Sequence, residues 1–176
     1  SVGQQVYPNI ETIVVDDGST DNTGEIVREH YPELTCIRQN NAGVSAARNT
    51  GADVSRGEFL VLLDADDEWD PRYVEHLVGL SELHPDAEIL ACNAAVSCGK
   101  HEFPFCRPPG PAMRELTLYE MLRGVRPPGV AFMVRREAFL RVGGFDASIL
   151  AAEDLDLMCR LVASGGKLIY SFEPLY

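Results

Sequence analysis

Apolar runs alternate with amphipathic segments along the chain, and this alternation predicts strands and helices that follow one another. Helical spacing of apolar residues, three or four apart, is typical of amphipathic helices, whereas short runs rich in β-branched residues favour strands. The predicted strands are 10–15, 34–39, 58–63, 87–96, 130–134 and 167–172. The predicted helices are 23–31, 44–54, 71–84, 117–124, 136–142 and one around 155–162. This order indicates an α/β fold with a doubly wound, mostly parallel sheet and helices on both faces.

Three segments refine this prediction of the fold. Residues 58–63, EFLVLL, form a continuous apolar run, which predicts a central parallel strand covered on both faces. Residues 99–114 hold four prolines and no clear period, and we interpret them as a loop. Thr117 and Glu120 have the spacing of a capping box, which predicts the start of a short helix. No internal repeat and no long linker divides the 176 residues, so we expect a single domain over 1–176.

Composition narrows the classes of function. The formal net charge of −12 argues against a nucleic-acid partner, because phosphate backbones need a basic surface. No apolar run approaches the roughly 20 residues that span a bilayer, so we expect no transmembrane segment. The five cysteines have irregular spacing, and we interpret them as free thiols of a reducing compartment. They are Cys36, Cys92, Cys98, Cys106 and Cys159.

Acidic residues gather where two predicted strands end. Asp16 and Asp17 follow the first strand, and Asp64 and Asp66 follow the third. Doubly wound sheets bind ligands beyond the carboxyl ends of their strands, so both pairs are expected in one crevice. Carboxylates this close repel one another, and a hard divalent cation such as Mg²⁺ or Mn²⁺ relieves the repulsion. The cation would also bridge a diphosphate ligand to this acidic protein.

Other charged residues have structural interpretations, and some of them also have functional ones. Asp67, Glu68 and Asp70 favour the N-terminus of the helix after Pro71. Glu153 and Asp154 lie in the first turn of the last helix, where they either compensate its dipole or supply a catalytic base. Arg48 either approaches the phosphates of a ligand or forms an ion pair with an Asp of the crevice.

Four motifs in order resemble those of family 2 glycosyltransferases, which have the Rossmann-like GT-A fold. They are YPNIETIVVDDGSTDNT, NNAGVSAARNTG, GEFLVLLDADD and GGFDASILAAEDLDLMCRL. The resemblance implies an inverting, metal-dependent transfer of sugar from a nucleotide-diphosphate donor, with UDP favoured, to a glycan, lipid-linked or protein acceptor. It further implies a cytoplasmic enzyme, free or at the membrane periphery, in cell-wall or polysaccharide biosynthesis.

The same resemblance assigns roles to residues of this sequence. Asp17 would contact the nucleotide base, and Asp64 and Asp66, the DxD motif, would handle ribose, Mn²⁺ or Mg²⁺ and diphosphate. Asp154 would be the catalytic base. Arg48 is a further candidate for donor binding, because of its place on the predicted helix that contains AARNTG.

The chain differs from this family at its ends. Family members begin with a strand and a helix before the YPN motif, so we expect about 20–30 further N-terminal residues that add a strand beside Ile13–Val15. The family pattern also continues beyond the C-terminal EPLY.

Three other functions stay open at this stage. A two-component receiver domain also has paired acids and Mg²⁺ at strand ends. A sugar nucleotidyltransferase shares the fold class, and so does a non-catalytic protein that binds sugar nucleotides.

Overall fold

The computed structural model describes residues 1–98, 101–105 and 111–176, and strands and helices alternate over most of its length. The strands are β1 Ile13–Asp16, β2 Thr35–Arg38, β3 Phe59–Val61, β4 Ala87–Asn93, β5 Ala95–Cys98, β6 His101–Pro104, β7 Met113–Leu116, β8 Phe132–Arg135 and β9 Lys167–Pro174. The helices are η1 Val2–Gln4, α1 Thr23–His30, α2 Val44–Val54, α3 Tyr73–Leu83, α4 Leu118–Leu122, α5 Arg136–Arg141 and α6 Glu153–Ala163.

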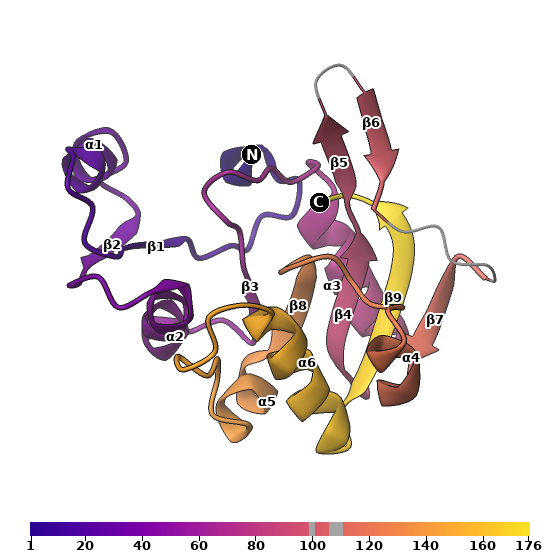
Figure 1. Ribbon diagram of the computed structural model, residues 1–176. Coiled ribbons are helices and arrows are strands. Elements are labelled where there is room, and N and C mark those ends of the chain that lie inside the picture. The colour runs from indigo at the N-terminus through magenta and orange to yellow at the C-terminus, as the bar shows by residue number, and fades with distance from the viewer. Residues whose placement is uncertain (99–100, 106–110) are drawn as a thin grey trace.

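The largest sheet has five strands in the order β3-β8-β4-β9-β7 (Figure 1). Only β4 and β9 pair in parallel in this sheet, while β8 runs antiparallel to both β3 and β4, and β7 runs antiparallel to β9. The α/β class is therefore confirmed, and the large sheet is mixed. The predicted central strand 58–63 is an edge strand of this sheet and lies antiparallel to its neighbour, because β8 returns between β3 and β4.

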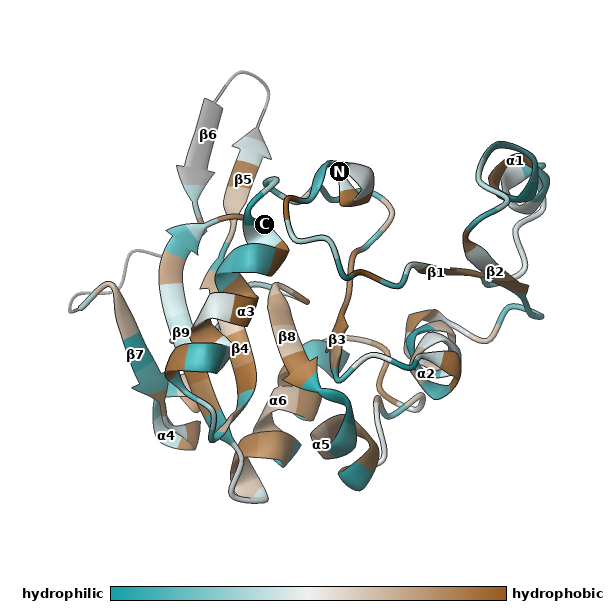
Figure 2. Ribbon diagram, turned by 180° about the vertical axis from the view of Figure 1, so that it is seen from behind, coloured by the Kyte–Doolittle hydropathy of each residue, from teal (hydrophilic) through white to brown (hydrophobic). Residues whose placement is uncertain are grey.

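Helices cover both faces of the large sheet, and strand residues alternate between them. Ile89 and Ala91 point to the face that carries α5 and α6, with Leu157, Met158 and Leu161. Leu90 and Cys92 point to the opposite face, where α3 supplies Tyr73 and Leu77. Figures 1 and 2 show α6 and α3 on these opposite faces. The alternation follows from the two-residue period of a strand, and burial of both faces agrees with the apolar run 89–92 within β4.

A smaller unit stands to one side of the large sheet. The parallel strands β1 and β2 and the helix α1 form it, and α2 lies between this unit and α5 and α6 (Figure 1). Within the described ranges, β1 pairs only with β2 and β3 pairs only with β8, so each of them has one edge without a strand partner. Such an edge is where a further strand can pair. The expected N-terminal strand beside Ile13–Val15 stays a prediction.

The prediction of a loop at 99–114 is wrong in part. Residues 101–104 form β6, which pairs with β5 in an antiparallel hairpin, and β7 begins at Met113. Pro104 ends β6 in this hairpin, and β7 is an edge strand of the large sheet. The loop prediction failed because strands at an edge tolerate proline and irregular patterns. Residues 99–100 and 106–110 lie outside the described part of the chain, and the prediction for Cys106 falls among them.

The prediction of a capping box is confirmed. The capping box is present, with Thr117 accepting from the Glu120 N–H and the Glu120 carboxylate accepting from the Thr117 N–H. Cys36, Cys92 and Cys159 are free thiols, and burial raises the pKa of Cys92 to about 12. None of the described helices is long and apolar enough to cross a lipid bilayer.

Candidate active site

Asp17 is held at the N-terminus of α2. Its carboxylate accepts the backbone N–H groups of Ala42 and Gly43 at 2.9 and 2.8 Å, and the Gln39 side-chain amide at 2.7 Å. Hydrogen bonds from Ala42, then Gln39 and Gly43, lower the pKa of Asp17. The carboxylate therefore stays ionised at neutral pH. Its Oδ2 accepts from Gly43 alone in the described contacts, so it has room for one donor such as an imide N–H of a base.

Arg48 links two acidic motifs that are far apart in the sequence. Its Nη2 lies 2.7 Å from Asp64 Oδ1, and its Nη1 lies 2.8 Å from Glu153 Oε1. The Arg48 side chain is 10% exposed, against 39% for Asp64 and 15% for Glu153. Burial opposes the charged guanidinium, but the hydrogen bonds and charges of Asp64 and Glu153 outweigh it and raise the pKa of Arg48. The ion-pair interpretation of Arg48 is observed, and the ion pair has two carboxylates.

Helix α2 connects these two regions. Gly43 is its N-cap and contacts Asp17, and Arg48 follows five residues later. At a helical rise of 1.5 Å per residue, five residues span about 7.5 Å along the axis. The predicted base-binding acid and the predicted diphosphate-binding acid therefore lie along one short helix.

The turn after β3 carries the DxD motif. The Asp67 N–H donates to the Asp64 carbonyl at 3.1 Å, which closes the turn, and the Tyr176 hydroxyl lies 3.5 Å from the Asp64 nitrogen. Burial raises the pKa of Tyr176, so its hydroxyl is protonated at neutral pH. Asp66 is exposed, and its carboxylate has no partner among the described residues.

The DxD residues suit a divalent cation by their chemistry. Mg²⁺ and Mn²⁺ take oxygen ligands, and one or two carboxylates suffice when phosphates and water complete the shell. Asp66 has both oxygens available, and Asp64 has one that Arg48 does not bind. No group of three or more Asp, Glu, His or Cys side chains in the described ranges is placed to hold a metal alone. The residues therefore fit an ion that is shared with a phosphate ligand.

The last helix presents the third acidic motif. Glu153 and Asp154 are its first two residues, and the N-cap Ala152 has φ 61°, in the left-handed region. A side chain in this region costs about 1–2 kcal/mol and persists only where the surroundings hold it. Glu153 is paired with Arg48, whereas Asp154 is 9% exposed and forms no ion pair among the described residues.

Not every predicted acid faces this region. The Asp16 carboxylate is buried, accepts the Ser19 N–H at 2.8 Å and lies 3.5 Å from Arg38, so it holds the loop after β1. Asp70 accepts from the N–H of Arg72, the N-cap of α3. Trp69 is buried and packs on Tyr73, with ring centroids 5.0 Å apart.

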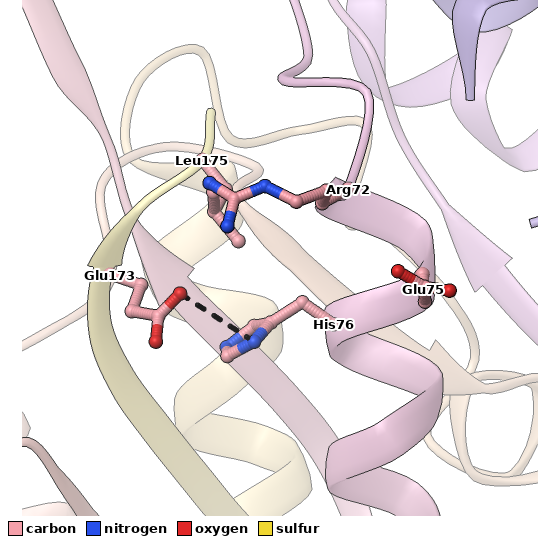
Figure 3. A pocket seen from close by; sticks show the side chains of 5 residues that line it. All are labelled: Arg72, Glu75, His76, Glu173 and Leu175. Carbon is pink, nitrogen blue, oxygen red and sulfur yellow. Dashed lines mark ion pairs between the residues drawn. The ribbon is translucent and has the colours of Figure 1, made fainter. Parts of the chain in front are cut away.

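A small pocket lies away from the acidic motifs. It has a volume of about 160 Å³ between α3 and the end of β9. His76 and Glu173 point toward one another there, 3.9 Å apart (Figure 3). None of the predicted site residues lines this pocket.

Sequence reasoning missed Asn49 and Phe145. Asn49 donates to the Phe145 carbonyl at 2.8 Å and accepts the Phe145 N–H at 2.9 Å, which joins α2 to the segment before α6. The available signal was an Asn inside a predicted helix, where its propensity is low unless its side chain has a specific partner.

Comparison with known proteins shows which family the chain resembles. A family model described as glycosyl transferase family 2 matches residues 1–145. An uncharacterized glycosyltransferase of Haemophilus influenzae is 28% identical over 179 residues, which cover 99% of this chain and 60% of that protein. The uncharacterized glycosyltransferase YibD of Escherichia coli is 41% identical over 93 residues, 51% of this chain and 27% of YibD. The chain thus spans less than two thirds of the length of either relative.

Solved structures share the fold. S. aureus TarS 1-349 in complex with UDP has a TM-score of 0.76 at 21% identity, over 99% of this chain and 53% of TarS 1-349. The mannosyltransferase PcManGT from Pyrobaculum calidifontis, in complex with GDP-Man and Mn²⁺, has a TM-score of 0.69 at 22% identity, over 98% of this chain and 48% of PcManGT.

Proposed function

Because the chain belongs to glycosyl transferase family 2, we propose that it transfers a sugar from a nucleotide-diphosphate donor, preferably UDP-linked, to an acceptor hydroxyl with inversion. The observation that carries this proposal is the Arg48 bridge. It brings Asp64, after β3, and Glu153, at the start of α6, to one site. The complexes of TarS with UDP and of PcManGT with GDP-Man and Mn²⁺ support a nucleotide donor.

The residues divide the reaction between them. Asp17 binds the base of the donor, and Arg48 and Asp64 lie where its diphosphate would be held. Asp154 takes the proton from the acceptor hydroxyl, whose oxygen then forms a bond to the anomeric carbon. The bond from that carbon to the diphosphate oxygen breaks, and its electron pair leaves with the nucleotide. A single displacement of this kind inverts the anomeric configuration.

A divalent ion completes the donor site in this proposal. Asp66 and Asp64 would hold Mn²⁺ or Mg²⁺, which would neutralise the charge that develops on the departing diphosphate. The chain carries a net charge of −12, so a diphosphate needs such a positive partner in addition to Arg48. The acceptor class, whether glycan, lipid-linked or protein, is left to experiment.

Metal-dependent binding of UDP tests the donor site. We expect UDP with Mn²⁺ to raise the free energy of unfolding of the full-length protein by about 2.7 kcal/mol at roughly a hundredfold excess over Kd. Replacing Asp66 with Ala should abolish the dependence on Mn²⁺, measured by calorimetry with and without chelator. Glu68→Ala is the matched control, since Glu68 is an exposed acid of the same turn.

Two outcomes would contradict the donor site. Equal UDP affinity of the wild-type protein with and without chelator would exclude the metal. Tighter binding of GDP than of UDP would contradict the preference for a uridine donor. A panel of UDP-sugars with Mn²⁺ then identifies the sugar that is transferred.

A further inference from the structure

The segment that leads into α6 is fastened to α2 by one side chain. Asn49 exchanges two hydrogen bonds with the backbone of Phe145, at 2.8 and 2.9 Å. We call this pair of bonds the Asn49 clamp. It reproduces the reciprocal N–H and carbonyl exchange of paired strands, with a side-chain amide in place of one backbone. Asp in its place could not donate to the carbonyl, and Gln would be one methylene too long.

The backbone beside the clamp is shaped for it. Gly144 has φ +68°, and a Cβ there would lie 2.6 Å from Asn49 Oδ1 and 3.1 Å from the Phe139 ring. On the other side, Arg160 of α6 donates to the carbonyls of Val142 and Gly144 at 2.8 and 2.7 Å. Residues 142–145 are thus held from α2 and from α6 together.

The aromatic ring of Phe145 joins the clamp to the Arg48 bridge. Phe145 is 2% exposed and packs edge to face on Phe139, with centroids 5.7 Å apart. The Arg48 guanidinium lies 5.2 Å from the Phe145 ring centroid, within the range of a cation–π contact. Arg48 and Asn49 are consecutive residues of α2. Arg48 contacts the acids Asp64 and Glu153, and Asn49 contacts the segment that leads to Glu153.

We propose that Asn49 is a positioning residue, which fixes the segment 143–152 so that the carboxylates at the start of α6 stay at a set distance from Asp64. This inference rests on the proposed function. Between Phe145 and α6 the segment is largely exposed, with Leu150 at 95%, and it ends at Ala152, which has left-handed backbone angles. A strained residue keeps its conformation only when its surroundings determine it.

The test compares Asn49→Ala and Asn49→Asp with the control Asp53→Ala, an exposed residue of the same helix. Hydrogen exchange of the full-length protein should become faster in residues 143–152 of both Asn49 variants and stay unchanged in β4. Calorimetry with UDP and Mn²⁺ should give a Kd within about twofold of wild type. With the UDP-sugar found in the panel, kcat should fall about 10- to 100-fold at an unchanged donor KM, because small displacements at a reacting centre are costly.

The outcomes separate this inference from the proposed function. Wild-type exchange in 143–152 of both variants, or wild-type kcat, would overturn the role of Asn49. An equal loss of UDP affinity, thermal stability and kcat would also overturn it, because a merely structural residue behaves so. If the wild-type protein transfers no sugar, the proposed function fails, and the exchange rates alone decide whether Asn49 holds the segment.

Discussion

Replacing Asp154 with Asn is expected to slow sugar transfer by about 10²–10⁴-fold, which is the usual contribution of a general base. Asn keeps the shape of the side chain but cannot accept a proton at neutral pH. Asp154 is suited to this role because it opens α6 beside Glu153 and has no ion-pair partner among the described residues. Nucleotide affinity should not change, since Asp17, Asp64 and Arg48 are intact.

Glu153→Gln is the matched comparison for this prediction. Glu153 Oε1 forms an ion pair with Arg48 at 2.8 Å, so this carboxylate is less available to accept a proton. We expect a smaller loss of kcat for Glu153→Gln than for Asp154→Asn, with donor affinity measured separately for each variant. If Asp154→Asn transfers sugar at the wild-type rate and Glu153→Gln is inactive, the base has been assigned to the wrong carboxylate. If both variants stay active, the base lies elsewhere.

Local signals in the sequence predicted the elements well. The helices 44–54 and 71–84 have regular apolar spacing, and the structure has α2 at Val44–Val54 and α3 at Tyr73–Leu83. The short helix after Thr117 was predicted from its capping box alone. These features depend on residues within one or two turns of each other, so a single sequence contains them.

The order and direction of the strands could not be predicted from local signals in the sequence. The apolar run 58–63 satisfies the pattern of a central parallel strand, yet β3 is at an edge and antiparallel to β8. Strand direction depends on the path of the chain between distant segments, and no local pattern records it. Burial of both faces by helices produces the same kind of apolar run in either direction, as residues 132–134 of β8 and 89–92 of β4 show.

In the candidate site, too, some residues could be predicted from the sequence and others could not. The acids after the strands were recognisable because neighbouring carboxylates are costly to bury without a partner, whereas the acids at the start of α6 were selected by the family resemblance. The residues that position these acids could not be recognised from the sequence, because the contacting residues are far apart in it. Arg48 and Glu153 are 105 residues apart, and Asn49 and Phe145 are 96 residues apart. Asp16 was expected in the crevice with Asp17, but it is buried under the loop after β1, because adjacent residues of a strand point to opposite sides.

Removing the Arg48 bridge is expected to destabilise the fold by about 3 kcal/mol, at the lower end of the range for broken buried ion pairs. Arg48→Ala leaves Asp64 and Glu153 without their cation. The Glu153 side chain is 15% exposed and gains little hydration, whereas Asp64 at 39% is partly hydrated, which limits the loss. Arg48→Lys should be intermediate, because one ammonium cannot reproduce the fork that binds two carboxylates.

Ligand binding should separate the two roles of Arg48. Arg48 binds one oxygen of Asp64, so in Arg48→Ala that oxygen becomes available and Mn²⁺ alone should bind more tightly. UDP with Mn²⁺ should bind more weakly, because the guanidinium that we propose to lie beside the diphosphate is lost. Urea unfolding and calorimetry on the full-length protein measure both effects. The control is Arg56→Ala, which removes the ion pair between Arg56 and Glu11. Arg56 is 85% exposed, and an exposed ion pair contributes about 0–1 kcal/mol to the free energy of unfolding. An Arg48→Ala protein as stable as the Arg56→Ala control, with unchanged affinity for Mn²⁺ and for UDP, would show that the bridge neither holds the site together nor competes for Asp64.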